Sequence, residues 1–381
     1  MIEKHDMTQG KILLPLVSFT IPLVLGNLFQ LTYNAADSVI VGKYVGEQAL
    51  AAVGTSTPIM NIAILLISGM CMGASVLMSS QYGAKDYDTL SKQISTTMLA
   101  GCGFSVVFSL LMLLLATPVL RLIRVPETAI PEAAVYLRII FLGLIFTFIY
   151  NFLANTMRAL GDSKTPFWFL LFSTILNILL DLFCILVLGW GVAGASIATV
   201  VSQGLSAFLC YHYMMRKFEI LQATPSERRF DRRLALNMLG IGVPMGLQFS
   251  ITAIGSIMLQ SANNALGTAC VAAFTSAMRI KMFFLCPLES LGMAMATYCG
   301  QNYGAGKPER IWSGIKASFL LMGVYVVANF VILWFGAKYM ALLFVSAADV
   351  EIIKDTELFL HVAATFFPML GLLCILRYSI Q

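Results

Sequence analysis

The stretch Val106–Ala116 has the sequence VVFSLLMLLLA, which contains no charge and none of the alternation of apolar and polar residues that a membrane β-barrel strand shows. Similar apolar runs recur along the whole chain of 381 residues, of which 59% are hydrophobic and only 11% are charged. An ordinary soluble domain is about 45–50% apolar and about 25% charged. The sequence therefore excludes a soluble fold and predicts an all-α polytopic membrane protein.

Ten apolar runs are long enough to cross the hydrocarbon core, which requires about 20 predominantly apolar residues. The first run contains Pro22 and Asn27 and lacks a small-residue cleavage pattern, so we expect it to be a retained span and not a signal peptide. The eight cysteines lie in or beside these runs without a C-x-x-C pair, which indicates small core residues. We place the runs near residues 12–34, 52–78, 93–117, 132–157, 166–188, 192–214, 235–260, 269–295, 313–335 and 357–378.

Basic residues are distributed unevenly between the two ends of these spans. The N-terminus and every second loop after it contain fifteen lysines and arginines, whereas the opposite set of loops contains five. Because cytoplasmic loops carry an excess of Lys and Arg, we expect the N-terminus and the loop around residues 219–233 to be cytoplasmic. The chain is then a multi-pass protein of the inner (plasma) membrane.

The chain repeats itself at an offset of about 221 residues. The matching pairs are Leu50–Val53 with Val271–Phe274, Tyr82–Ala84 with Tyr303–Ala305, and, with a slip of one residue, Pro22 with Pro244. Six spans fit within the offset, and an even number makes the two copies parallel, related by an axis along the membrane normal.

The repeat predicts an N-lobe of six spans at residues 1–215, a basic cytoplasmic linker at 216–234, and a C-lobe at 235–381. Only four spans of the second copy fit into the chain, because that copy ends at the counterpart of residue 160. Either the chain is truncated or it is an unusual ten-span protein, and we expect truncation, with the last two helices of the second lobe absent from this chain.

Three carboxylates lie within or at the end of apolar runs, namely Asp37, Asp181 and Glu289. A charge at bilayer depth costs at least about 2.5–3.5 kcal/mol on insertion scales, so each is a candidate functional residue. Asp181 shares a helix face with Asn177, four residues earlier. Asp37 closes the first span, where it either binds an ion or reaches water as a helix-end residue. Desolvated carboxylates with amide and hydroxyl neighbours can bind Na⁺ or hold a proton, so both coupling ions stay open.

The second half of the chain offers weaker candidates. Glu289 has Lys281 and Arg279 two to three turns earlier on its helix, which provides a structural alternative to a functional role. Methionines, of which the chain has 21 and of which Met245 is one, give an adaptable apolar wall suited to varied ligands, although lipid-facing positions also accept them.

Several motifs occur together along the chain: Pro22, Ala36–Gly42, Ala49–Gly54, Gln81–Ala84, Arg158–Pro166, Asn177–Asp181, Gly191–Ala195 and Gln301–Ala305. In combination they make the whole chain resemble the multidrug and toxic compound extrusion (MATE) transporters, in the branch of bacterial drug exporters. The resemblance implies twelve helices in two pseudo-symmetric six-helix lobes, which form a V and rock between outward and inward openings.

The resemblance also implies a cation site in the N-lobe. In this sequence the site falls on Asp37, Asn151, Asn177, Asp181 and Thr199. If Na⁺ is the coupling ion, Asp37, Asn177 and Asp181 are its expected metal ligands. Some relatives also use acids in the seventh and tenth spans, whereas this chain has Gln248 and Gln260 in the seventh and no acid in the tenth beyond Glu357. The expected ion site therefore shifts to the N-lobe, and Gln248, Met245 and Glu289 are candidate substrate residues of the C-lobe.

These observations together predict a monomeric secondary antiporter that exports lipophilic organic cations in exchange for H⁺ or Na⁺, with no cofactor, no catalytic residue and no nucleic-acid partner. A flippase for a lipid-linked saccharide is the alternative, disfavoured because the spans offer few basic residues for a pyrophosphate. A membrane-embedded enzyme is disfavoured because no span contains a His/Glu metal pair or a Gly-x-Ser-x-Gly nucleophile.

Overall fold

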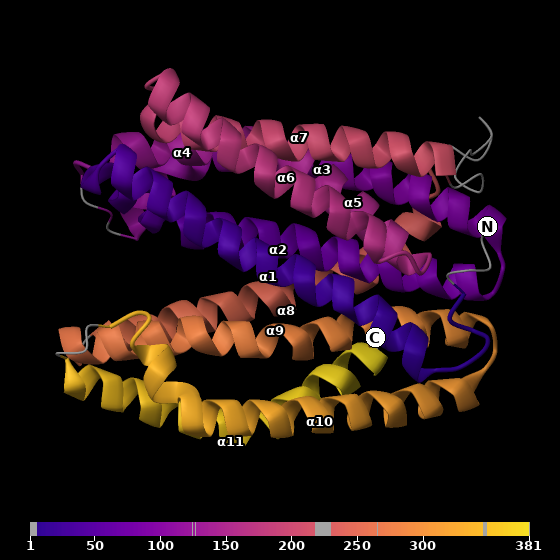
Figure 1. The fold of residues 1–381 in the computed structure, drawn as a ribbon. Coiled ribbons are helices and arrows are strands. Elements are labelled where there is room, and N and C mark those ends of the chain that lie inside the picture. The colour runs from indigo at the N-terminus through magenta and orange to yellow at the C-terminus, as the bar shows by residue number, and fades with distance from the viewer. Residues whose placement is uncertain are drawn as a thin grey trace. The chain divides into compact units, whose positions relative to one another are not determined.

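The computed structural model describes residues 6–123, 125, 127–217, 230–264, 266–345 and 349–380, and the side chains at 33–39, 47, 48, 50, 51, 264 and 268 lie outside that description. The described residues are almost entirely helical and contain no strand, which confirms the predicted all-α fold (Figure 1). The helices are α1 (Leu13–Tyr44), α2 (Glu47–Gly83), α3 (Tyr87–Leu122), α4 (Ile130–Leu142), α5 (Leu144–Ala159), α6 (Lys164–Leu182), the π-helical turn η2 (Phe183–Val187), α7 (Gly191–Lys217), α8 (Arg232–Asn264), α9 (Thr268–Gly304), α10 (Pro308–Ala341) and α11 (Val350–Ile380).

Nine spans in the described part of the chain are long and apolar enough to cross a membrane, and α4 with α5 forms a tenth that is bent by 47°. The ten predicted runs are thus confirmed, and the bend lies at Gly143, between the two short helices. One boundary was wrong, because α1 does not close at Asp37 but continues to Tyr44. No proline interrupts that last stretch, and the helix ends just before Gly46, whose φ of +118° favours glycine.

The internal repeat is visible in the helix boundaries. Helices α2 and α9 both contain 37 residues and lie 221 positions apart. Each follows a glycine with a positive φ, +118° at Gly46 and +100° at Gly267. Each also ends before an alanine of nearly identical backbone conformation, with φ of −72° at Ala84 and −74° at Ala305. The repeated sequence therefore forms the same helix with the same ends twice.

The chain forms two compact units that differ from the two repeats. The first unit combines Met1–Leu28 with Ile254–Gln381, and the second is Phe29–Ala253. The division falls inside α1 and α8. The start of α1, up to Leu28, belongs to the first unit with α9, α10 and α11, and the start of α8, up to Ala253, belongs to the second unit with α2 to α7. The lobe and linker boundaries predicted from the sequence stay predictions.

Within the second unit, α2 and α8 cross at four glycines. A Cβ atom added at Gly69 would lie 2.4 Å from the Cα of Gly246, and one added at Gly73 would lie 2.6 Å from the Cα of Gly242. Both pairs have the spacing of a GxxxG motif, which allows two helix backbones to approach closely in lipid. Dispersion contacts at this distance hold helices together where the hydrophobic effect supplies no driving force between them.

We expect the glycine crossing to tolerate no side chain. Substitution Gly246→Ala should lower the free energy of unfolding by about 1–3 kcal/mol, the usual cost of overpacking, because its Cβ would lie 2.7 Å from the Leu66 carbonyl oxygen. Gly240→Ala, on the same helix with nothing within 4 Å of the added Cβ, is the matched control. It should be neutral or stabilising by up to about 1 kcal/mol. Thermal unfolding in detergent measures both, and equal midpoints would contradict the tight crossing.

Candidate cation-binding site

The structure brings together three of the residues proposed for the cation site. Asp181 and Asn177 lie on α6 and are 0% and 2% exposed. With its amide oriented to satisfy both neighbours, Asn177 donates to Oδ2 of Asp181 at 2.9 Å and accepts from the backbone N–H of Thr199 at 3.2 Å. The Oγ1 atom of Thr199, on α7, lies 3.3 Å from the same amide oxygen. A buried carboxylate is therefore hydrogen-bonded to an amide, and a hydroxyl lies on the other side of that amide.

Close packing between α7 and η2 places Thr199 opposite Asn177. A Cβ atom added at Gly194 would lie 3.1 Å from the Cβ of Cys184, which shows how near the start of α7 comes to η2. The π-helical turn follows Asp181 within one turn of helix, and single π-helical turns are frequent at functional sites. The motif Gly191–Ala195 thus has a physical role, because a larger residue at Gly194 would push α7 away from the carboxylate.

Asn151 lies on α5 in the same compact unit. Its Nδ2 atom donates to the Thr147 carbonyl oxygen, one turn back along its own helix, at 2.8 Å. Its backbone carbonyl oxygen accepts from Nδ2 of Asn155 at 2.8 Å. The side-chain amide of Asn151 thus bonds back to its own helix, and its participation in a cation site stays a prediction.

Asp37 belongs to α1, and its backbone lies in the same compact unit as Asp181. Its side chain lies outside the described residues. The prediction that Asp37 and Asp181 share one site is therefore neither supported nor opposed by the geometry, and it stays a prediction.

The structure divides the candidate substrate residues between the two units. Met245, which is buried, and Gln248, which is half-buried, lie on α8 within the second unit. Glu289 lies on α9 in the first unit and has an exposed side chain. The cations whose charges act on Glu289 are Arg377 of α11 and Lys281. Sequence spacing suggested Lys281 but could not indicate Arg377, which is distant along the chain.

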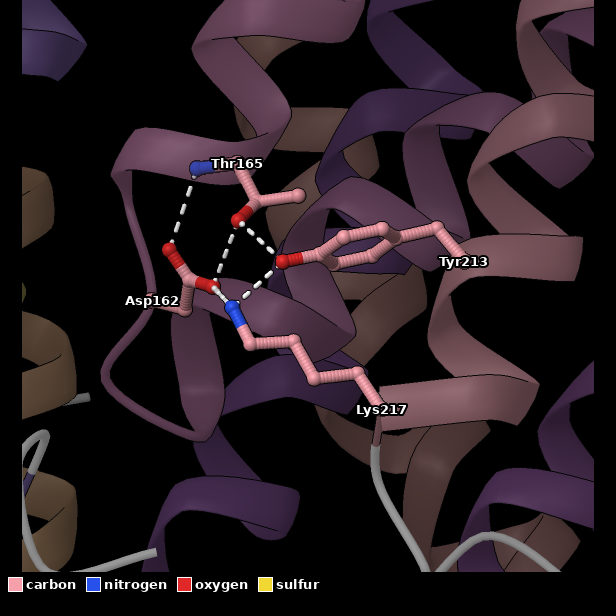
Figure 2. A network of polar contacts seen from close by, with 4 residues as sticks. All are labelled: Asp162, Thr165, Tyr213 and Lys217. Atoms are coloured by element: carbon pink, nitrogen blue, oxygen red, sulfur yellow. Dashed lines mark hydrogen bonds and ion pairs between the residues drawn. The ribbon is translucent and has the colours of Figure 1, made fainter. Parts of the chain in front are cut away.

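A polar network at the ends of α5, α6 and α7 was not predicted as a unit (Figure 2). The Asp162 carboxylate is 2% exposed. It accepts from the Thr165 backbone N–H at 3.0 Å and from Thr165 Oγ1 at 2.7 Å. The Thr165 hydroxyl also lies 3.4 Å from the Tyr213 hydroxyl on α7.

Lys217 completes this network from the last residue of α7. Its Nζ atom lies 3.6 Å from Oδ2 of Asp162 and donates to the Tyr213 hydroxyl (Figure 2). The network thereby links the start of α6 to the end of α7. It helps to fix the relative position of the two helices that carry the candidate cation site. The motif Arg158–Pro166, quoted above for its family resemblance, contains the acid and the threonine of this network.

The chain is similar to known transporters over nearly its whole length. The family model described as MatE matches residues 22–183 and 244–381. The probable multidrug resistance protein YpnP of Bacillus subtilis (strain 168) is 30% identical over 370 residues, which are 97% of this chain and 82% of that protein. The multidrug export protein MepA of Staphylococcus aureus (strain MSSA476) is 21% identical over 357 residues, 94% of this chain and 78% of that protein.

Solved structures show the same fold. A crystal structure of MATE in complex with MaL6 superimposes with a TM-score of 0.87 at 24% identity, and the match covers 98% of this chain and 86% of the other. At this level of identity the likeness concerns the arrangement of helices, which agrees with the two-lobe architecture expected from the sequence.

We expect the Asp162 network to stabilise the bundle. Asp162→Ala should lower the free energy of unfolding by about 1–3 kcal/mol, because it removes an acceptor of charge-assisted hydrogen bonds and leaves the part-buried Thr165 backbone N–H without its partner. Asp88→Ala, an exposed acid in the first turn of α3, is the control and should change stability by less than about 0.5 kcal/mol. Denaturation in detergent compares the two variants, and equal losses would argue against a special role for Asp162.

Proposed function

This chain belongs to the MatE family of membrane transporters, and from that premise we propose that it is a secondary antiporter that exports lipophilic organic cations in exchange for H⁺ or Na⁺. The observation that carries the proposal is the fully buried Asp181 carboxylate, hydrogen-bonded to Asn177 and with Thr199 alongside. The names of two relatives support this proposal, because one is a probable multidrug resistance protein and the other a multidrug export protein.

A buried carboxylate couples transport to a cation for an electrostatic reason. Ionised Asp181 is costly in a desolvated surrounding, and either a bound proton or a bound Na⁺ removes that cost. The amide and hydroxyl oxygens of Asn177 and Thr199 can complete a set of oxygen ligands, which hard cations prefer. Occupancy of the site by the coupling ion then biases one of the two openings of the transporter, because a ligand shifts an equilibrium by its difference in affinity for the two states.

The same electrostatics favour cationic substrates. A carboxylate that has released its proton or Na⁺ attracts a positively charged molecule, so coupling ion and substrate alternate in neutralising one acid. We further propose that the protein works as a monomer in the plasma membrane with its N-terminus in the cytoplasm, as the distribution of basic residues indicates.

We expect both proposed acids to be essential for transport. Asp181→Asn and Asp37→Asn should each reduce ethidium efflux from cells at least about tenfold and abolish resistance to the dye, with the amount of protein in the membrane unchanged, because a neutral amide neither takes up a proton nor supplies the negative charge that a cation neutralises. Asp88→Asn serves as the control and should transport normally. Undiminished efflux in both variants would refute the assignment of the ion site.

The coupling ion can be identified in proteoliposomes that carry an imposed Na⁺ gradient or an imposed pH gradient. Export of a fluorescent cation should be driven by one of the two and should stop when both gradients are collapsed. Thr199→Val, which removes one oxygen ligand at nearly constant volume, should raise the half-saturating Na⁺ concentration about tenfold if Na⁺ is the ion, roughly the effect of one charge-assisted contact. It should change the pH-driven rate less than about twofold if H⁺ is the ion. Uphill export without either gradient would contradict antiport.

A further inference from the structure

The segment that precedes α1 is held by side chains from the end of α9 and the start of α10. We call residues 6–10 the strap. All three guanidinium nitrogens of Arg310 donate hydrogen bonds. One terminal nitrogen donates to the carbonyl oxygen of Gly10 at 3.1 Å, and the other donates to those of Gln9 and Met7 at 3.3 Å. Nε donates to Oδ1 of Asn302 at 3.2 Å. One guanidinium therefore holds three carbonyl groups of a segment about 300 residues away in sequence.

Three neighbouring side chains form further hydrogen bonds with the strap. Lys307 donates to the Thr8 carbonyl oxygen at 2.9 Å, and Asn302 donates to that of Met7 at 3.3 Å. The Met7 backbone N–H donates to Oε1 of Gln301 at 3.1 Å. All four carbonyl oxygens from Met7 to Gly10 thus accept from this set of side chains. Gln301 and Asn302 are 0% exposed, whereas Lys307 and Arg310 are half-buried, so these contacts combine a buried, oriented base with partly accessible charged groups.

Two features of the strap itself favour this set of contacts. The Met7 side chain is 4% exposed and belongs to an apolar cluster that also contains Phe19 of α1 and Cys299 of α9. Gly10 has a φ of +72°, a conformation that other residues rarely adopt, and its carbonyl accepts from Arg310. The strap is therefore inserted between the start of α1 and the later helices of the first compact unit.

The strap contact joins one repeat to the other. The strap precedes the first helix of the first repeat, whereas Gln301, Asn302, Lys307 and Arg310 belong to the second repeat. The second unit contains the reciprocal contact, in which the backbone N–H of Asp231, just before α8, donates to Oγ1 of Thr96 on α3 at 3.2 Å. In both units, side chains of one repeat therefore bind the segment that precedes the first helix of the other repeat.

Alternating access, on which this inference rests as part of the proposed function, requires contacts between repeats to open on one side at a time. The distribution of basic residues places the loop between α9 and α10, with Lys307 and Arg310, on the expected cytoplasmic side, which is also the expected side of the basic linker. We propose that Arg310 is a positioning residue that latches the strap, and with it the start of α1, to the second repeat, and that the latch is released when the linker side opens. Its polar bonds are partly accessible, so water replaces them on release at small net cost.

A native thiol reports the state of the latch. Cys299 shares the cluster with Met7 and is 6% exposed, whereas Cys374 of α11 is 5% exposed in the same compact unit but outside that cluster. In the full chain reconstituted in liposomes, Arg310→Ala should increase the rate of Cys299 modification by a membrane-permeant maleimide at least about tenfold, resolved by peptide mass spectrometry. The rate for Cys374 should stay within about twofold, and Arg310→Lys, which keeps one donor group, should give an intermediate rate at Cys299.

The matched control is Lys316→Ala, which removes the same charge from an exposed position two turns further along α10. It should leave Cys299 at the parental rate. In dye export, Arg310→Ala should lower the maximal rate about tenfold while the apparent KM stays within about twofold, with protein amount and unfolding temperature measured alongside. A parental rate at Cys299 in Arg310→Ala, a parallel rise at Cys374, or an unchanged maximal rate of export would each overturn the latch. Thiol labelling needs no transport, so absence of dye export by the parent chain would instead refute the proposed function.

Discussion

A carboxylate placed among membrane-spanning helices is the constraint on which the rest of this structure depends. Asp181 is fully buried, and an ionised acid without water must find partners or give up its charge. Asn177 supplies one hydrogen bond from the preceding turn, and Thr199 must come from α7. That requires α7 to pack tightly against η2, which Gly194 permits. The close packing of α7 on η2 is thus what allows Thr199 to reach the amide that binds this carboxylate.

The two repeats share a backbone plan but differ in one of their spans. Helices α2 and α9 have the same length and the same end conformations, so the helix framework follows from repeated glycines and apolar runs. The first repeat then has a broken span at Gly143, whereas the corresponding stretch of the second repeat is the continuous helix α11. The two repeats therefore share a helix framework without sharing every detail of their spans.

Sequence periodicity predicted the spans well, because an apolar run of about 20 residues in lipid has no stable alternative to a helix. The proximity of Asn177 and Asp181 was predictable from their spacing of four on one helix. Contacts between distant segments were not. Thr165 and Tyr213, or Arg310 and the strap, are separated by 48 and about 300 residues, and no local pattern encodes such pairs. The end of α1 was misplaced at Asp37 because a charged residue was taken as a helix end, whereas the backbone continues until Gly46 requires a positive φ.

Helix α1 connects the two parts of the molecule that matter most for the proposed mechanism. It contains 32 residues and is therefore about 48 Å long. Its first residues follow the strap held by Arg310, and Asp37 lies in its last third. The compact units divide α1 after Leu28, so its first half packs with the second repeat and its second half with the first. Pro22 removes one backbone hydrogen bond within the first half. On the proposal that Asp37 takes part in the ion site, a change at that site and a change at the latch act on the same helix from opposite ends. The backbone of α1 then offers a direct connection between them, with no chain of intermediate side chains.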